Sequence, residues 1–268
     1  MSSGSASSYI HPGRLGFLRR KQLLPSKEGI PHLIRVAAIG DLHCGGGSAG
    51  TLRETLERLS SHADVLLLAG DLTLHGEARE ARVLAGALAG TGLPMIAVLG
   101  NHDYHLDSQD DIRKAMEDAG VCVLEGTGTT IAVNGTPLSV AGTKGFGGGF
   151  AGACGSDFGE PEMKAFIRHT KELAARLEET LAGLDGDLRI ALLHYSPTET
   201  TLQGERLELY PFMGSYLLGE AIDRAGADLV LHGHAHSGNE KGLTPGGIHV
   251  RNVARPVIRH PYKVYPLG

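Results

Sequence analysis

Short apolar runs alternate with longer amphipathic stretches along this chain. The apolar runs are rich in Val, Ile and Leu, and each closes on Gly, Asp, Asn or His, so we expect buried strands. The predicted strands cover residues 34–39, 65–69, 95–99, 131–133 with 138–141, 190–193, 229–231 and 248–250. The intervening stretches have helical period and predict helices at residues 50–62, 77–89, 108–119, 160–182 and 214–225. Such alternation is typical of an α/β layered fold.

Two segments add detail to this pattern. The predicted helix at 160–182 has one apolar stripe and should lie on a sheet face. The stripe consists of Met163, Phe166, Ile167, Leu173, Leu177 and Leu181. Residues 142–159 are rich in glycine and separate two ordered elements. We therefore predict a long functional loop there rather than a domain linker.

Composition and charge describe an ordinary globular protein. The 268 residues are 41% hydrophobic and 21% charged, which predicts one domain over residues 34–268. The Ser/Gly-rich and then basic residues 1–33 are expected to form a flexible arm. A formal net charge of −5 argues against a nucleic-acid or membrane-surface binder. No apolar run is long enough to span a bilayer.

The three cysteines indicate a reducing compartment. Cys44, Cys122 and Cys154 are an odd number at irregular spacings, which does not suit a disulfide framework. We therefore expect a cytoplasmic protein. Cys44 lies beside a candidate metal ligand, but we interpret it as a small buried thiol.

Metal-ligand residue types follow the ends of five predicted strands. They are Asp41 and His43, then Asp71, then Asn101, then His194, and finally His234 with His236. In open α/β sheets, ligands bind at the carboxyl ends of the strands, so these side chains should converge. Each motif alone would be a turn or a solvated histidine pair. Together, and in this order, they indicate a metal site.

The donor types narrow the choice of metal. Carboxylate, imidazole and amide donors suit Mn, Fe or Zn, and the lack of paired thiolates disfavours a structural zinc site. An Asp-x-His or His-x-His segment can present two ligands from one short stretch of chain. A pair of transition metal ions is therefore expected, with Mn or Fe preferred over Zn.

The ordered set Asp-x-His, Gly-Asp, Gly-Asn-His-Asp, His and Gly-His-x-His, which runs over residues 41–236, resembles the calcineurin-like metallophosphoesterase superfamily. The resemblance implies a four-layer α-β-β-α sandwich of two mixed sheets flanked by helices. It also implies that one metal is bound by Asp41, His43 and His236, the other by Asn101, His194 and His234, and that Asp71 bridges both.

The same resemblance implies a reaction. His102 matches the position that protonates the leaving oxygen or stabilises the transition state, and its runner-up role is to orient substrate. A hydroxide bridging the two metals would attack a phosphate ester. The pocket would stay electropositive inside an acidic protein and attract a small phosphorylated substrate.

A homo-oligomer is also conceivable from the sequence.

One segment of this chain differs from the corresponding segment of the protein phosphatases in the superfamily. Protein serine/threonine phosphatases of the superfamily have a segment similar to Gly-Asp-x-x-Asp-Arg-Gly. In this chain Leu74 stands in place of the second Asp of that segment. Protein dephosphorylation is therefore disfavoured, and another group must orient His102. Asp103 is a weak candidate because its more ordinary role is backbone capping. The segment looks more like that of small bacterial phosphodiesterases.

The residues around the site each have more than one interpretation. Lys144, in the glycine-rich loop, is a candidate phosphate contact, or else the loop is a surface hairpin. His75 could line the pocket mouth or lie in a surface loop. Residues 198–216 are unusually apolar and predict a lid, a subunit contact or packing against the sandwich.

A phosphodiesterase on small substrates is the favoured function. The first alternative is a phosphomonoesterase that does not act on proteins, because both would use the same ligands. A nuclease is disfavoured because the net charge is negative and no basic stripe is present. A non-catalytic metal-binding scaffold is the least favoured interpretation, since every ligand type and His102 are intact.

Overall fold

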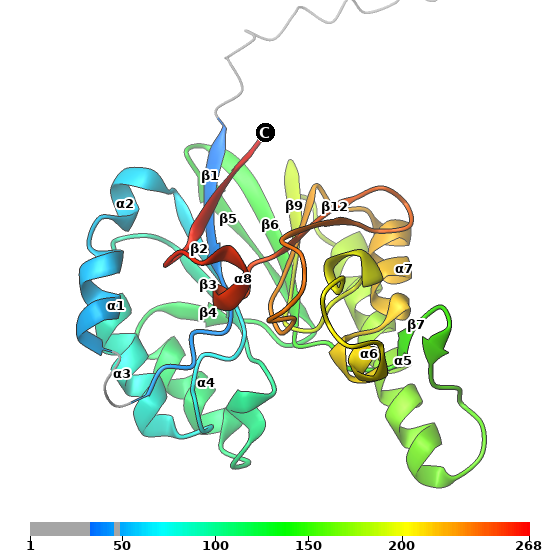
Figure 1. The fold of residues 1–268 in the computed structure, drawn as a ribbon. Coiled ribbons are helices and arrows are strands. Elements are labelled where there is room, and N and C mark those ends of the chain that lie inside the picture. Colours follow the sequence, from blue (N-terminus) through cyan, green and yellow to red (C-terminus); the bar gives the residue numbers. More distant parts are fainter. Residues whose placement is uncertain (1–32, 46–48) are drawn as a thin grey trace, which may run out of the picture. The chain divides into compact units, whose positions relative to one another are not determined.

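The computed structural model describes residues 33–45 and 49–268. Apart from Leu33, the arm predicted at residues 1–33 lies outside the described residues. Within the described part, two large β-sheets face each other with helices on their outer faces (Figure 1). No helix in this part is both long and apolar enough to cross a bilayer.

The first sheet has five strands in the order β13-β1-β2-β3-β4. They are β13 (Lys263–Leu267), β1 (Ile34–Ile39), β2 (Val65–Ala69), β3 (Met95–Val98) and β4 (Val121–Val123). Strands β1 to β4 are parallel, and β13 pairs with β1 in the antiparallel direction. The central strand β2 reads Val-Leu-Leu-Leu-Ala and is buried throughout, as expected for a parallel strand covered on both faces.

The second sheet has six strands in the order β11-β12-β10-β9-β6-β5. They are β11 (Lys241–Leu243), β12 (His249–Asn252), β10 (Leu229–His232), β9 (Leu188–Leu193), β6 (Thr136–Thr143) and β5 (Thr127–Val133). The four inner strands are parallel, and both edge strands are antiparallel to their neighbours. A separate hairpin joins β7 (Gly149–Phe150) to β8 (Ala153–Cys154).

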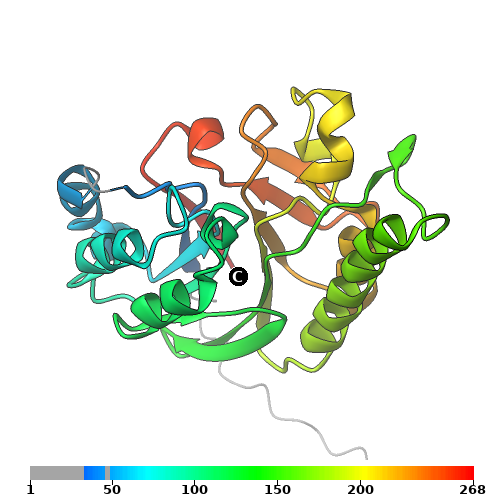
Figure 2. The same ribbon diagram turned by 90° about the horizontal axis from the view of Figure 1, so that it is seen from below.

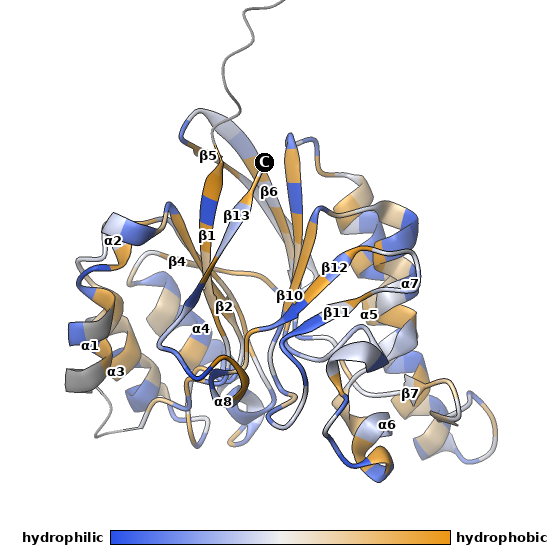
Figure 3. Ribbon diagram, turned by 45° about the horizontal axis from the view of Figure 1, so that its top comes forward, coloured by the Kyte–Doolittle hydropathy of each residue, from blue (hydrophilic) through white to orange (hydrophobic). Residues whose placement is uncertain are grey.

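Three apolar clusters hold four layers together. Residues such as Val36, Leu67 and Leu192 fill the space between the sheets. On the outer face of the first sheet lie α1 (Ala49–Leu56), α2 (Leu59–His62), α3 (Ala78–Leu88) and α4 (Gln109–Glu117), and on that of the second lie α5 (Pro161–Ala182) and α7 (Tyr216–Ala225). Figure 2 shows these helix layers on opposite sides, and Figure 3 shows hydrophobic stretches on both strands and helices. The predicted α-β-β-α sandwich of two mixed sheets is confirmed.

The predicted elements differ from the observed ones mainly in short segments. The helix expected at residues 50–62 is two helices, α1 and α2. The apolar pattern did not predict β4, β11 or β13, which have only three to five residues and lie at or beside sheet edges. Helix α5 buries most of its predicted stripe, but Met163 near its first turn is 45% exposed. A short element has too few residues to show a clear hydrophobic period, so its conformation depends on pairing with neighbouring strands.

An ion pair joins the neighbouring strands β1 and β2 at one end of the first sheet. The backbone N–H of Arg35 donates to Asp64 Oδ2 at 2.7 Å, and its guanidinium nitrogen Nη2 lies 2.7 Å from Asp64 Oδ1. The hydrogen bonds from Arg35 hold the pKa of Asp64 down at about 2 against the opposing effect of burial. The ionised carboxylate is therefore favoured in the folded state.

We expect Asp64→Asn to lower the melting temperature at pH 7 by a few degrees. Because the folded-state pKa of Asp64 is lowered to about 2, the stability that its charge contributes is present above the ordinary carboxyl range and is lost as the pH falls toward 2. Thermal unfolding at pH 7 and at pH 2.5 to 4 measures this, and the wild-type advantage should shrink over that interval. Asp118→Asn, at an exposed carboxylate paired with Lys114, is the control and should change little. A wild-type advantage over the Asp64→Asn variant that is constant with pH would contradict the role of charge.

Candidate metal centre

The candidate ligands come together where parallel strands of both sheets end. Asp41 follows β1, Asp71 follows β2, His194 follows β9 and His234 follows β10. Three groups of potential ligand atoms form there, and within each group all atoms lie within 4.8 Å of one another. The groups are Asp41, His43 and His236; His43, Asp71 and His102; and Asp71, His194 and His234. His43 and Asp71 each belong to two groups, so the clusters form one continuous site.

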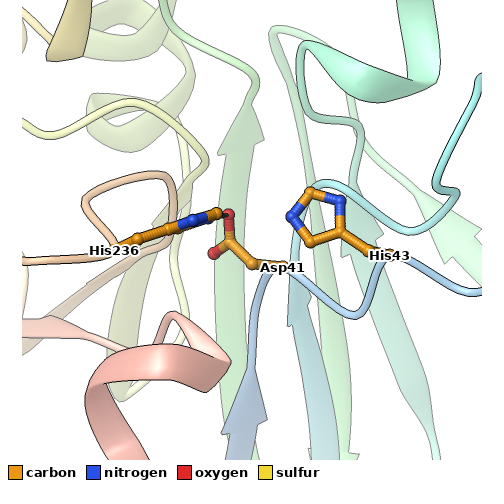
Figure 4. Close-up of side chains that lie close together, drawn as sticks. All are labelled: Asp41, His43 and His236. Carbon is orange, nitrogen blue, oxygen red and sulfur yellow. Dashed lines mark hydrogen bonds and ion pairs between the residues drawn. The ribbon is translucent and has the colours of Figure 1, made fainter.

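Asp41, His43 and His236 form the first trio, which Figure 4 shows. His236 Nε2 donates to Asp41 Oδ1 at 2.8 Å, and the His43 ring lies on the other side of Asp41 in this view. Burial raises the pKa of Asp41, but the hydrogen bond from His236 and the nearby imidazoles outweigh it, so this pKa lies below its usual value. The same hydrogen bond raises the pKa of His236. A metal ion bound here would replace that proton.

Asp71 lies between this trio and the second set of ligands. Its Oδ2 is 3.8 Å from His43 Nε2, and its Oδ1 is 3.3 Å from His194 Nε2. The carboxylate is buried, and Oδ1 also accepts a hydrogen bond from the backbone N–H of His102 at 2.9 Å. Its two oxygens therefore face different imidazoles, an arrangement that would suit a carboxylate shared by two metal ions.

Asn101, His194 and His234 form the second trio. The carbonyl of Ala69 accepts from His194 Nδ1 at 2.9 Å, so Nε2 is the nitrogen left to face the site. Nε2 lies 2.9 Å from Asn101 Oδ1, and a cation suits this pair because both atoms can offer it a lone pair. Burial lowers the pKa of His234 to about 3. His234 is therefore neutral, which is the form that binds metals.

Four of the candidate ligands have backbone angles that residues with side chains seldom adopt. The φ angles of Asp41, His43, Asp71 and His234 are 57°, 42°, 50° and 69°. Such left-handed conformations each cost about 1–3 kcal/mol and cluster at functional sites. Gly100 fits the same interpretation, because a Cβ there would collide with the carboxylate and backbone nitrogen of Asp71. The loops are shaped to present ligands rather than to minimise local strain.

His102 lies at the edge of the site, and its ring centroid is 4.4 Å from that of His43. Its Nε2 is 4.0 Å from Asp71 Oδ2, whereas the carbonyl of Leu74 accepts from its Nδ1 at 2.8 Å. The main chain of Leu74 therefore orients His102. The sequence could not identify this group, since any residue offers a carbonyl.

Asp103 does not orient His102. Its buried carboxylate accepts hydrogen bonds from the backbone N–H groups of Leu72, Thr73 and Gly100 and from the Thr73 hydroxyl. Burial raises the pKa of Asp103, and these hydrogen bonds oppose the rise. The backbone-capping role expected for Asp103 thus matches its contacts, which tie the loop after β2 to the loop after β3.

The two candidate substrate contacts lie in different surroundings. Lys144 Nζ is 4.7 Å from the ring centroid of Tyr104, and the rings of Phe146 and Tyr195 are also near it. Burial lowers the pKa of the Lys144 ammonium, while Glu125 and Asp71 oppose the shift. The carbonyl of Lys144 accepts from the backbone of His194, so Lys144 directly adjoins the second trio.

The His75 side chain pairs with helix α3 rather than with the candidate ligands. Its Nδ1 pairs with Glu80 Oε1 on α3 at 2.8 Å, and its side chain is 59% exposed. The described contacts of His75 do not include the ligand clusters.

The glycine-rich loop at residues 142–159 and the segment 198–216 both have buried parts near the site. Residues 149–154 do form a hairpin, but its first strand is buried, and Gly147 lies against Pro211 and Phe166. In the segment 198–216, Leu202 and Met213 are buried, whereas Leu207 and Phe212 are exposed. The carbonyl of Phe212 lies 3.2 Å from His234 Nε2, so part of this segment supports the second trio. Cys44 is buried, as expected, and free.

Sequence reasoning missed several residues that support the ligands. Buried Asn252 donates to the carbonyl of Ala235, between the two ligand histidines, and accepts from the backbone of Ala254. His232 is buried, with Nε2 2.8 Å from the Thr201 hydroxyl, and burial lowers its pKa to about 4. Asn252 ends β12, so the same strand-end rule that found the ligands could have identified it.

In this four-layer sandwich the parallel strands of both sheets end on shared carboxylate and imidazole clusters, which are suited to hold metal ions. Residues 34–238 match the family model described as calcineurin-like phosphoesterase, and the chain belongs to that family. The family acts on phosphoester bonds, and its members bind divalent metal ions.

Solved structures share the fold. The phosphopantetheinyl hydrolase of Mycobacterium tuberculosis is 17% identical with a TM-score of 0.64, over 86% of this chain and 95% of that one. GAP50, the anchor in the inner membrane complex of Plasmodium, is 14% identical with a TM-score of 0.54, over 84% of this chain and 72% of that one. At these identities the likeness concerns the fold alone. A comparison with curated proteins gave no match.

Proposed function

We propose that this protein is a binuclear metal-dependent phosphohydrolase that cleaves small phosphodiesters, with phosphomonoesters as the second candidate. The observation that carries the proposal is the position of Asp71, whose two carboxylate oxygens face different ligand groups at 3.3 and 3.8 Å. Nitrogen and oxygen donors without thiolates suit Mn or Fe, and also Zn. Two such ions, when bound, polarise the phosphoryl group and make water a nucleophile near neutral pH.

The side chains have separate tasks in this proposal. Asp41, His43 and His236 hold one ion, Asn101, His194 and His234 hold the other, and Asp71 holds both. His102 turns Nε2 toward the site because the Leu74 carbonyl accepts from Nδ1. In its protonated form, His102 gives the Nε2 proton to the leaving oxygen, which becomes an alcohol.

Other functions have less support. A nuclease would need a basic surface, and the net charge is −5. The GAP50 structure is described as an anchor, which makes a non-catalytic scaffold a fair alternative for any chain with this fold. Here both trios and His102 are in place. We therefore rank catalysis first. We propose a cytoplasmic location separately, because the three cysteines do not suit a disulfide framework.

Metal content and hydrolysis measured on the same samples test the proposal. We expect about two equivalents of Mn, Fe or Zn per chain, hydrolysis of bis(p-nitrophenyl) phosphate faster than that of p-nitrophenyl phosphate, and loss of both activities after chelation. Activity should return when metal is added back. A faster monoester reaction would favour the phosphomonoesterase. Folded protein that binds metal and hydrolyses neither compound would overturn the enzyme proposal.

A further inference from the structure

A cavity of about 550 Å³ adjoins the first trio. Asp41, Leu42 and His43 line one part of it, and the rest is formed by Arg255, Pro256 and Arg259. Two arginines therefore line the same cavity as two candidate metal ligands. Its volume lies in the range of small-molecule sites.

The backbone holds the two arginines near Asp41. Helix α8 (Arg255–Ile258) begins at Arg255, and the backbone N–H of Arg255 donates to the carbonyl of Gly40 at 3.0 Å. Ala254 and Gly40 also form a β-bridge. Figure 4 shows α8, the faint red helix, close to Asp41. Because Gly40 directly precedes Asp41, the position of α8 is fixed relative to the metal ligands.

The positive charges of these two arginines have no ion-pair partner among the described residues. Both side chains are exposed, and neither makes a hydrogen bond or an ion pair with another described residue. By contrast, Arg35 pairs with Asp64, and Arg224 pairs with Glu178. Guanidinium groups bind phosphate and carboxylate through paired hydrogen bonds. The cavity wall is therefore suited to an oxyanion.

We propose that Arg255 and Arg259 bind a second oxyanion of the substrate, a phosphate or a carboxylate separate from the reacting phosphoryl group. This inference rests on the proposed function and specifies its substrate class as a small organic phosphate with two anionic groups. The reacting group lies at the ligand clusters, and the second lies in the arginine-lined cavity. The subsite also explains how an acidic protein selects a polyanionic substrate.

Matched inhibitor pairs test the subsite with the metal-loaded protein. Fructose 1,6-bisphosphate is compared with fructose 6-phosphate, and 3-phosphoglycerate with glycerol 3-phosphate, as competitors of bis(p-nitrophenyl) phosphate. We expect the member with two anionic groups to bind about 10-fold to 100-fold more tightly in at least one pair. A preference in the first pair identifies phosphate, and one in the second identifies carboxylate. The Arg255→Gln/Arg259→Gln double variant should reduce either preference to near unity.

Controls separate the subsite from general charge and from catalysis. Arg82→Gln removes an exposed arginine on α3, outside the cavity, and should keep the wild-type preference. Calorimetric titration with the same compounds gives the ratios without turnover. A protein that hydrolyses nothing would overturn the proposed function while the titration still decides the subsite. Equal binding within both pairs, a preference that survives in the double variant, or an equal loss in Arg82→Gln would overturn the inference.

Discussion

Asp71→Asn should abolish phosphohydrolase activity, because it removes a carboxylate whose oxygens face both ligand groups. The change keeps the shape of the side chain but removes its charge and one oxygen. Loss of a partner that only orients a metal ligand costs about 10-fold to 100-fold in metal affinity or activity, so loss of a shared ligand should exceed that range. We expect the bound metal to fall from about two equivalents to one or fewer. Metal analysis after dialysis, with kcat/KM for the diester, measures both effects.

The control for Asp71→Asn is Asp64→Asn. It changes a carboxylate in the same sheet that pairs with Arg35, away from the ligand clusters. It should reduce thermal stability and leave metal content at the wild-type level. Circular dichroism of metal-free Asp71→Asn should match that of metal-free wild type. Two equivalents of metal and near wild-type turnover in Asp71→Asn would rule out a bridging role.

His102→Ala should lower kcat by about 10²-fold to 10⁴-fold on substrates with poor leaving groups, the range that a positioned general acid supplies. The imidazole is oriented by the Leu74 carbonyl on one side and turns Nε2 toward Asp71 on the other. An alkoxide needs a proton as it leaves, whereas p-nitrophenolate is stable without one. Kinetics on a series of phosphodiesters with graded leaving groups should therefore show a loss that grows with leaving-group pKa. Metal content should stay at the wild-type level.

His105→Ala is the matched control for His102→Ala. His105 is an exposed histidine on the same loop, three residues from His102 and outside the ligand clusters. Its replacement should leave the leaving-group dependence unchanged. A loss in His102→Ala that is the same for every leaving group would assign His102 the orienting role instead. Loss of metal in that variant would show that it acts as a ligand.

Much of the fold followed from apolar periodicity. Strands β1, β2, β9 and β10 are mostly buried on both faces, so nearly continuous apolar runs predict them. Helix α5 has a 22-residue amphipathic pattern, which is long enough to be unambiguous. Edge strand β13 contains a proline and pairs on only one side, so its sequence has no such signal. Its place depends on pairing with β1 at the other end of the chain.

The division into two sheets came from the resemblance rather than from the pattern. A parallel strand buried between a helix layer and a second sheet has the same apolar run as one buried between two helix layers. Contacts such as Val36 with residues of the opposite sheet decide between these arrangements. Only the tertiary structure contains them.

The sequence by itself determined which side chains could meet. Asp, Asn and His placed directly after buried strands must lie at one edge when the strands are parallel, because strand direction fixes where each one ends. The tertiary structure decided how those side chains are used. It placed the two oxygens of Asp71 toward different ligand groups, gave His102 the Leu74 carbonyl, and brought Arg255 beside Asp41. These relations join residues up to about two hundred positions apart, in part through backbone atoms, which have no residue-specific signal along the chain.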